Sequence, residues 1–107
     1  MVKRRDIILA RVFFSDMPED KVRPAIVLSN EKYNSEGFLL VASITTALDE
    51  YCIPISEKDI NCQLDKNSSA RFDGVIKLHN KQIIRVIGRV SPGFHKNLIE
   101  KIISIIK

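Results

Sequence analysis

The sequence of 107 residues has little of what cofactor and metal sites are built from. It contains two cysteines, two histidines, four glycines and no tryptophan. Neither Cys52 nor Cys62 has the spacing of a zinc ligand, and one pair is no disulfide framework, so we expect two reduced thiols. Glycine-rich phosphate loops, HExxH and GxSxG are absent. These absences disfavour nucleotide hydrolysis, dinucleotide binding and zinc or serine hydrolysis, and we expect no cofactor and no metal.

The sequence also lacks a long apolar run. No stretch approaches the roughly 18 apolar residues of a membrane span. The basic and then apolar start is similar to a signal peptide, but Asp6 opens the apolar stretch, Arg11 interrupts it and no small-residue cleavage site follows. We therefore expect a cytoplasmic protein that does not associate with a membrane.

The composition is that of one ordinary globular domain, which we place at residues 1–107. Hydrophobic residues make up 45% and charged residues 28%, a balance that disfavours disorder. The net charge of +4 is unevenly spread: residues 64–107 hold nine basic and three acidic residues, whereas residues 24–63 hold two basic and six acidic ones. The basic segment permits a polyanionic partner without requiring one.

Short apolar runs separated by turn residues indicate a small β-rich domain. The first run is apolar on both faces, which predicts a strand covered on both sides. After Ser91, a plausible helix N-cap, and Pro92, the apolar spacing becomes helical, and we expect its apolar stripe to form core or a dimer interface. A small β-barrel with one C-terminal helix is the architecture that follows. The predicted strands cover residues 6–14, 24–29, 38–45, 51–55, 68–72 and 82–90.

Several polar residues stand at the ends of these apolar strands. Arg23 precedes the second strand, Thr45 ends the third, and Arg71 and Asp73 share one face around the fifth with Ser69. Because a barrel gathers strand ends at its rim, these side chains could converge there. Arginines and a threonine can hold phosphate oxygens, and an aspartate can accept a proton. Such a set suits metal-free RNA cleavage, in which the 2′-hydroxyl of the RNA attacks the adjacent phosphorus.

Each of these residues also has a purely structural interpretation. Arg23 could form a salt bridge with Glu19 or Asp20 on the surface. Arg71 and Asp73 could be an ion pair on one face of a solvated strand. The threonine at the end of the third strand could be a turn residue. The pattern alone therefore leaves both interpretations open.

Two further pairs of residues are considered in the same way. Arg85 and Arg89 share one face of the last predicted strand, where they form either a solvated surface or a track for phosphates. His79 and His95 are expected to be surface residues. The proposed RNA-cleavage chemistry of the strand-end residues needs none of these four side chains.

Three sequence blocks, taken together, resemble a known family. RPAIVLSN (23–30), VASIT (41–45) and RFD (71–73) occur in the order found in MazF/PemK (Kid) toxins of type II toxin–antitoxin systems, and the resemblance spans about residues 5–106. It implies an SH3-like small barrel of the MazF/PemK/CcdB kind with a C-terminal helix, usually a homodimer. It also implies a metal-independent, sequence-selective endoribonuclease on single-stranded RNA, above all mRNA, giving 2′,3′-cyclic phosphate and 5′-hydroxyl ends. A cognate antitoxin would block the RNA groove, and the complex would bind DNA through the antitoxin.

The resemblance also assigns roles to individual residues. We expect Asp73 to be the general base, although Arg23 is given that role in some members, because the pKa of an arginine lies far above neutral. Arg23 and Arg71 would stabilise the phosphorane. The expected catalytic residues are Arg23, Thr45, Arg71 and Asp73, and the expected RNA-binding residues are Lys21, Ser69, Arg85 and Arg89.

The sequence departs from the family pattern in two places. Arg5 stands where a glycine usually precedes the aspartate of the first strand, and the loop 15–22 is short and lacks glycine. Two rival functions remain: a gyrase-poisoning toxin of the same fold, and a noncatalytic barrel that binds RNA or protein. A gyrase poison needs none of the polar residues at the strand ends, and a noncatalytic binding barrel does not need Asp73.

Overall fold

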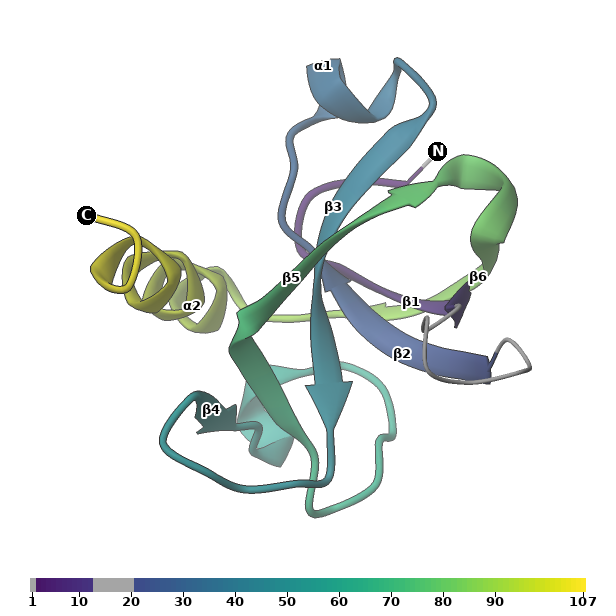
Figure 1. Ribbon diagram of the computed structural model, residues 1–107. Coiled ribbons are helices and arrows are strands. Elements are labelled where there is room, and N and C mark those ends of the chain that lie inside the picture. The colour runs from purple at the N-terminus through teal and green to yellow at the C-terminus, as the bar shows by residue number, and fades with distance from the viewer. Residues whose placement is uncertain (1, 13–20) are drawn as a thin grey trace.

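Six antiparallel strands and one long helix make up the computed structural model, which describes residues 2–12 and 21–107 (Figure 1). The strands follow one another in the sheet in the order β4-β5-β3-β2-β1-β6. Residues 13 and 14 of the first predicted strand and most of the predicted loop 15–22 lie outside the described residues. The strands are β1 (Asp6–Val12), β2 (Lys21–Val27), β3 (Phe38–Thr45), β4 (Cys52–Pro54), β5 (Ser69–His79) and β6 (Ile83–Arg89). The helices are α1 (Glu31–Asn34) and α2 (Pro92–Ser104), with 3-10 turns η1 (Glu57–Asp59) and η2 (Asn80–Gln82).

The sheet curls around an apolar core. Leu78 of β5 and Ile83 of β6 pack into the same cluster as Val41, although three strands separate β5 from β6 in the sheet. Among the described residues the two edge strands β4 and β6 do not pair with each other, and a single bridge between Ile60 and Val90 links this side of the molecule. The predicted fold class, mainly β with a C-terminal helix, is confirmed, while the sheet itself is not closed.

Helix α2 covers the opposite face of the sheet. It begins as predicted: the Ser91 hydroxyl accepts a hydrogen bond from the Phe94 amide at 3.2 Å, and Pro92 is the first helical residue. Phe94 and Leu98 are buried in a cluster that includes Ile7 of β1. The neighbouring β1 residues contribute to the core on the other face, so β1 is covered on both sides, as its two apolar faces predict.

Strand β5 is longer than the predicted 68–72 because an irregularity interrupts its pattern. Ala70 pairs with Ile44 and Val75 pairs with Ala42, so the four residues from Arg71 to Gly74 lie opposite Ser43 alone. This bulge ends the alternation of buried and exposed side chains, and the strand resumes beyond it. A Cβ on Gly74 would lie 3.2 Å from Cγ of Arg71, so the glycine gives that side chain room to lie along the bulge.

A second irregularity corrects the predicted common face of Arg85 and Arg89. Leu9 pairs with Arg85, whereas Asp6 pairs with Arg89, and the register shifts by one residue between them at Ile87. Because side chains alternate along a strand, one extra residue sends the following side chains to the other face. The two arginines therefore lie on opposite faces of the sheet, not in one track.

The prediction that both histidines are surface residues is wrong for His95. This side chain is 8% exposed, between α2 and the sheet, and its Nε2 atom has no hydrogen-bond partner among the described residues. Burial, together with the charges of Arg4 and Arg5, lowers its pKa. His79 is only partly buried, and its Nδ1 accepts the Lys81 amide at 3.1 Å.

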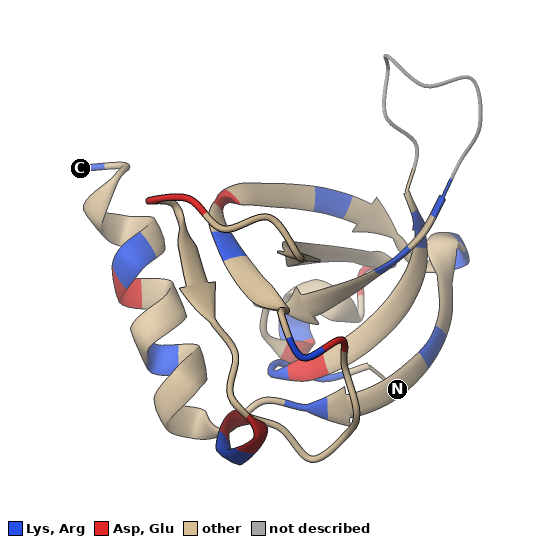
Figure 2. Ribbon diagram, turned by 90° about the horizontal axis from the view of Figure 1, so that it is seen from below, with Lys and Arg blue, Asp and Glu red and all other residues tan. Residues whose placement is uncertain are grey.

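Basic residues of the 64–107 segment do not gather on one side of the molecule. They are distributed over β5, β6 and α2, as the blue ribbon segments of Figure 2 show. A polyanion would therefore have to be recognised locally rather than by a uniformly basic face. Within the described residues, no helix has the length and apolar character needed to span a bilayer.

Candidate active site

A cavity of about 440 Å³ lies where β2 begins and β3 ends. Arg23, Thr45 and Arg71 all line it, although they come from β2, β3 and β5. The three strands are neighbours in the sheet, and their antiparallel pairing places the start of β2, the end of β3 and the start of β5 at one edge. Three of the four expected catalytic residues thus share one cavity, and its volume is that of a small-ligand site.

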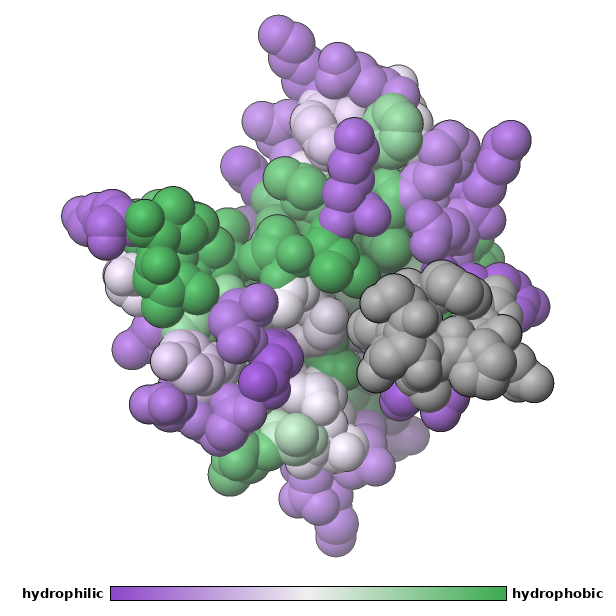
Figure 3. Space-filling view, viewed as in Figure 1, coloured by the Kyte–Doolittle hydropathy of each residue, from purple (hydrophilic) through white to green (hydrophobic). Residues whose placement is uncertain are grey.

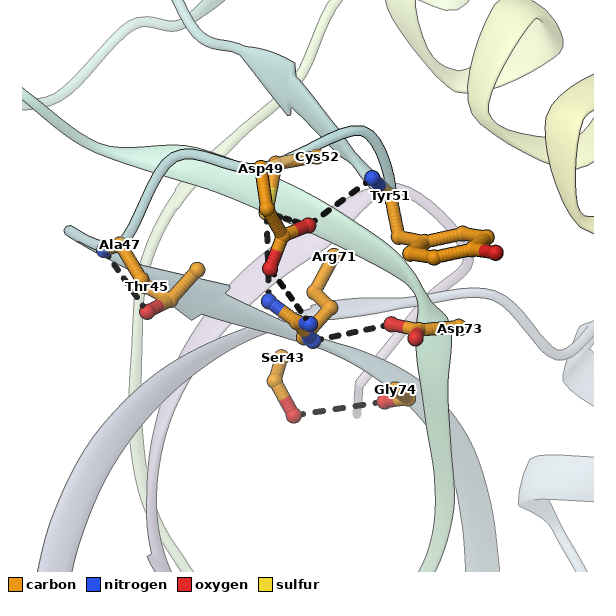
Figure 4. Close-up of polar contacts among 9 residues, drawn as sticks. All are labelled: Ser43, Thr45, Ala47, Asp49, Tyr51, Cys52, Arg71, Asp73 and Gly74. Carbon is orange, nitrogen blue, oxygen red and sulfur yellow. Dashed lines mark hydrogen bonds and ion pairs between the residues drawn. The ribbon is translucent and has the colours of Figure 1, made fainter.

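The Arg71 guanidinium is held by three neighbours (Figure 4). Its Nε lies 2.9 Å from Oδ1 of Asp73, and its Nη2 lies 2.8 Å from Oδ2 of Asp49. Its Nη1 donates to Sγ of Cys52 at 3.4 Å. The hydrogen bond to Asp49, with the charges of both carboxylates, keeps the pKa of Arg71 above its already high usual value.

Asp73 adjoins the cavity without lining it. It lies in the β5 bulge, where its side chain is 35% exposed and its partner is the Nε of Arg71. The Arg71–Asp73 ion pair considered from the sequence is therefore present. The pair also stands beside the cavity, so its presence does not decide between the structural and the chemical interpretation.

Thr45 and Arg23 differ in how firmly they are held. The Thr45 hydroxyl oxygen accepts the Ala47 amide at 3.1 Å, as a turn residue would, and its hydroxyl proton stays available. The Arg23 side chain is exposed and makes no hydrogen bond or ion pair within the described part of the chain. The salt bridges to Glu19 or Asp20 that the sequence allowed lie outside the described residues.

The four expected RNA-binding residues are not brought together. Lys21 is exposed at the start of β2. Arg85 lines a second cavity of about 580 Å³ that adjoins the first. Arg89 instead lies beside Asp6, with its Nε 3.1 Å from the carboxylate. Ser69 is 2% exposed and lines neither cavity, so its side chain is not accessible to a ligand.

One functional candidate, Asp49, was missed by the sequence analysis. It follows β3 in a turn, where its Oδ1 accepts the Tyr51 amide at 2.9 Å while its Oδ2 binds Arg71. These hydrogen bonds lower its pKa. The Asp-X-Tyr spacing could have indicated a turn capped by its own aspartate. Nothing in the sequence indicated a partner on β5.

The described residues contain no group of three or more histidine, cysteine, aspartate or glutamate side chains that could hold a metal ion. Cys52 and Cys62 are both free thiols. Burial raises the pKa of Cys62. The polar side chains that line the cavity are those of arginine, aspartate, threonine and serine.

The fold and this rim define a small, mainly β protein with a cavity that two arginines line beside a carboxylate. Residues 3–106 match the family model described as PemK-like, MazF-like toxin of type II toxin-antitoxin system. The chain belongs to this family, as its sequence blocks predict. A comparison with curated proteins gives no match.

Several solved structures of toxins in this class have the same fold. A MazE–MazF complex from Deinococcus radiodurans has a TM-score of 0.77 at 13% identity, covering 97% of this chain and 94% of that chain. The Mycobacterium tuberculosis toxin MazF-mt6 has a TM-score of 0.73 at 24% identity, covering 92% of both chains. An endoribonuclease in complex with its cognate antitoxin, from a mycobacterial species, has a TM-score of 0.74 at 13% identity, covering 97% and 93%. At these identities the likeness establishes the fold.

Proposed function

We propose that this protein is the toxin of a type II toxin–antitoxin pair and acts as a metal-independent, sequence-selective endoribonuclease on single-stranded RNA. The observation that carries the proposal is the convergence of Arg23, Thr45 and Arg71 on one cavity, with Asp73 bound to Arg71 at its edge. Two guanidinium groups offer planar arrays of donors that match phosphate oxygens. Membership of a toxin family whose members are typically endoribonucleases supports the same reading.

In the proposed reaction the RNA supplies its own nucleophile. The Asp73 carboxylate takes the proton of a ribose 2′-hydroxyl, and the 2′ oxygen attacks the adjacent phosphorus. The bond from phosphorus to the 5′ oxygen breaks, which leaves a 2′,3′-cyclic phosphate and a 5′-hydroxyl. Arg23 and Arg71 stabilise the charge on the phosphorane and on the leaving 5′ oxygen, which takes its proton from solvent water, while the Thr45 hydroxyl donates to a non-bridging oxygen. DNA lacks the nucleophile and would not be cleaved.

The test is cleavage of a long single-stranded RNA by the purified protein in EDTA, with both new ends mapped chemically. We expect cyclic phosphate and 5′-hydroxyl ends. We also expect Arg23→Ala to lower the cleavage rate by about 100-fold or more. Intact RNA, or equal cleavage by the Arg23→Ala protein, would refute the proposal in favour of a noncatalytic RNA-binding or protein-binding domain. Poisoning of gyrase without RNA cleavage would identify the other rival.

The role of Asp73 is tested separately. Asp73→Asn keeps the size of the side chain and an oxygen for Arg71, but it removes the proton acceptor. We expect the cleavage rate to fall by about 100-fold or more. An unchanged rate would leave the endoribonuclease proposal standing and would transfer the role of base to another group.

The partners we propose are a second copy of the chain and a cognate antitoxin. The predicted apolar stripe of α2 is divided: Leu98 is buried, whereas Ile103, Ile105 and Ile106 near the end of the chain are exposed. Figure 3 shows apolar side chains gathered over this end of the helix and over the neighbouring part of the sheet. Exposed apolar surface of this kind supports association with other chains. Light scattering of the isolated protein, and copurification with the product of an adjacent gene, would test the two partners.

A further inference from the structure

We propose that Asp49 is a positioning residue that holds the Arg71 guanidinium in place while Asp73 changes its charge. The inference rests on the proposed function and deepens it. If Asp73 takes a proton from the 2′-hydroxyl, its attraction for Arg71 weakens at the moment when the phosphorane carries most charge. A second carboxylate that does not take part in the proton transfer would keep the guanidinium fixed through that step.

The geometry around Arg71 separates these two tasks. Asp73 binds Nε, whereas Asp49 binds Nη2 at the far side of the planar group. The Cys52 thiol occupies one donor of Nη1. A guanidinium has five N–H donors, so one on Nη1 and one on Nη2 remain for a ligand. Arg71 also lines the cavity, where those two donors can meet a phosphate.

Asp49 is itself held firmly enough to serve as an anchor. Its Oδ1 accepts the Tyr51 amide at 2.9 Å, and its backbone carbonyl accepts the Cys52 amide at 3.2 Å. The same turn leads into β4, whose residue Cys52 pairs with Arg71. The Asp49 carboxylate is thus fixed by the turn that leads into β4, the strand that pairs with β5 beside the bulge. Figure 4 shows Asp49 and Asp73 on different sides of the guanidinium.

The decisive variant is Asp49→Asn. An asparagine keeps an oxygen for the Tyr51 amide and therefore keeps the turn, but it loses the charge that binds Arg71. Asp59→Asn is the matched control, because Asp59 likewise caps a turn, accepting the Ser56 amide at 2.9 Å, and makes no ion pair with another described residue. Thermal unfolding of both variants shows whether either substitution disturbs the fold.

The first measurement does not depend on activity. Nitrogen-15 NMR of the arginine side chains, with Arg71→Lys to assign the signal, reports whether the Arg71 Nη atoms are distinct or averaged by rotation. We expect distinct Nη signals in the wild type and the Asp59→Asn control, and averaged signals in Asp49→Asn. Distinct signals that persist in Asp49→Asn would overturn the anchoring role.

The second measurement is RNA cleavage under saturating and limiting substrate. We expect Asp49→Asn to lower kcat by about 10- to 100-fold while KM changes less than about twofold, because the loss falls on orientation and not on substrate binding. On the Arg71→Lys background the same substitution should cost less than about twofold, because the two side chains act as a unit. An equal loss on both backgrounds, or tighter RNA binding by Asp49→Asn, contradicts the proposal. If the wild type leaves RNA intact, the proposed function fails and the Nη signals alone decide for or against Asp49.

Discussion

Two arginines on irregular strands, Arg71 and Arg89, show how similar ion pairs can have different uses. Arg89 lies beside Asp6, whose side chain is 8% exposed. Arg71 lies between Asp73 and Asp49, whose side chains are 35% and 44% exposed, and it borders a cavity. Both arginines have a carboxylate partner. They differ in how deeply that partner is buried.

Burial decides what each pair contributes to the free energy of folding. A buried carboxylate that loses its partner remains as an uncompensated charge, so breaking the pair lowers the free energy of unfolding substantially. Asp6 is tied in further by the Lys3 amide, which donates to it at 2.8 Å. An exposed pair contributes little to stability, so its residues can be changed with little effect on the fold. The comparison assigns Arg89 to the fold and Arg71 to chemistry.

The largest expected effect is on catalysis. Arg71→Ala should lower the rate of RNA cleavage by about 100-fold or more, because it removes a charge that the phosphorane needs. The same substitution should leave the free energy of unfolding nearly unchanged, because the ion pairs that it breaks are exposed. Single-turnover cleavage and urea denaturation measure the two effects. A large loss of stability together with a small loss of rate would reverse the comparison.

Asp6→Ala should show the opposite behaviour. Removing this buried carboxylate leaves the Lys3 amide without its acceptor and the half-exposed Arg89 without its partner, and we expect the free energy of unfolding to fall by about 2 kcal/mol. The folded fraction should cleave RNA at the wild-type rate. Urea denaturation of Asp6→Ala and Asp73→Ala side by side provides the control, and equal losses in the two variants would show that burial is not the deciding quantity.

The buried His95 extends the comparison to pH. Its pKa in the folded state is lowered by burial and by two nearby arginines, so the unfolded chain binds a proton more readily. Stability should therefore be full above the ordinary histidine pKa of about 6.5 and fall at lower pH, by up to about 1.4 kcal/mol per pH unit. Urea titrations between pH 7.5 and 5.5 measure the slope. If His95→Gln shows the same slope, another group is responsible.

The smallest effect concerns Arg5, which has a φ of 78° in the region that favours glycine. Its side chain donates to the Val90 carbonyl at 3.1 Å. Arg5→Ala loses that hydrogen bond and keeps the strained backbone, whereas Arg5→Gly loses the bond and relieves the strain. The glycine variant should therefore be more stable than the alanine variant by about 1 kcal/mol. Equal midpoints of thermal unfolding would contradict this.

Local patterns predicted the elements well where alternation or capping was undisturbed. β3 has the predicted bounds of 38–45, and α2 begins at the predicted Pro92. The bulge in β5 and the extra residue Ile87 in β6 escaped detection, because each depends on pairing with a distant strand. An inserted residue leaves no mark on composition, yet it decides which face the following side chains occupy.

The candidate site was predictable only in part for the same reason. Arg23, Thr45 and Arg71 could be grouped because each stands at the end of an apolar strand, and the resemblance to a family supported the grouping. Asp49 could not be added, because its partner lies 22 residues further along the chain. Ser69 was grouped with Arg71 and Asp73 on one face of the predicted strand, but it pairs with both β3 and β4 and is buried.

The bulge from Arg71 to Gly74 makes chemistry and folding separable by mutation. Its residues face a single residue of β3, so changes within it do not shift the register of the strands on either side. Phe72 is the bulge residue that belongs to the core, and the charged residues on either side of it do not. A variant inactivated by substitution of Arg71 or Asp73 would keep the exposed end of α2 and could still bind its partners. Such a variant would not be toxic to a host that produces it, and those partners could be isolated by copurification with it.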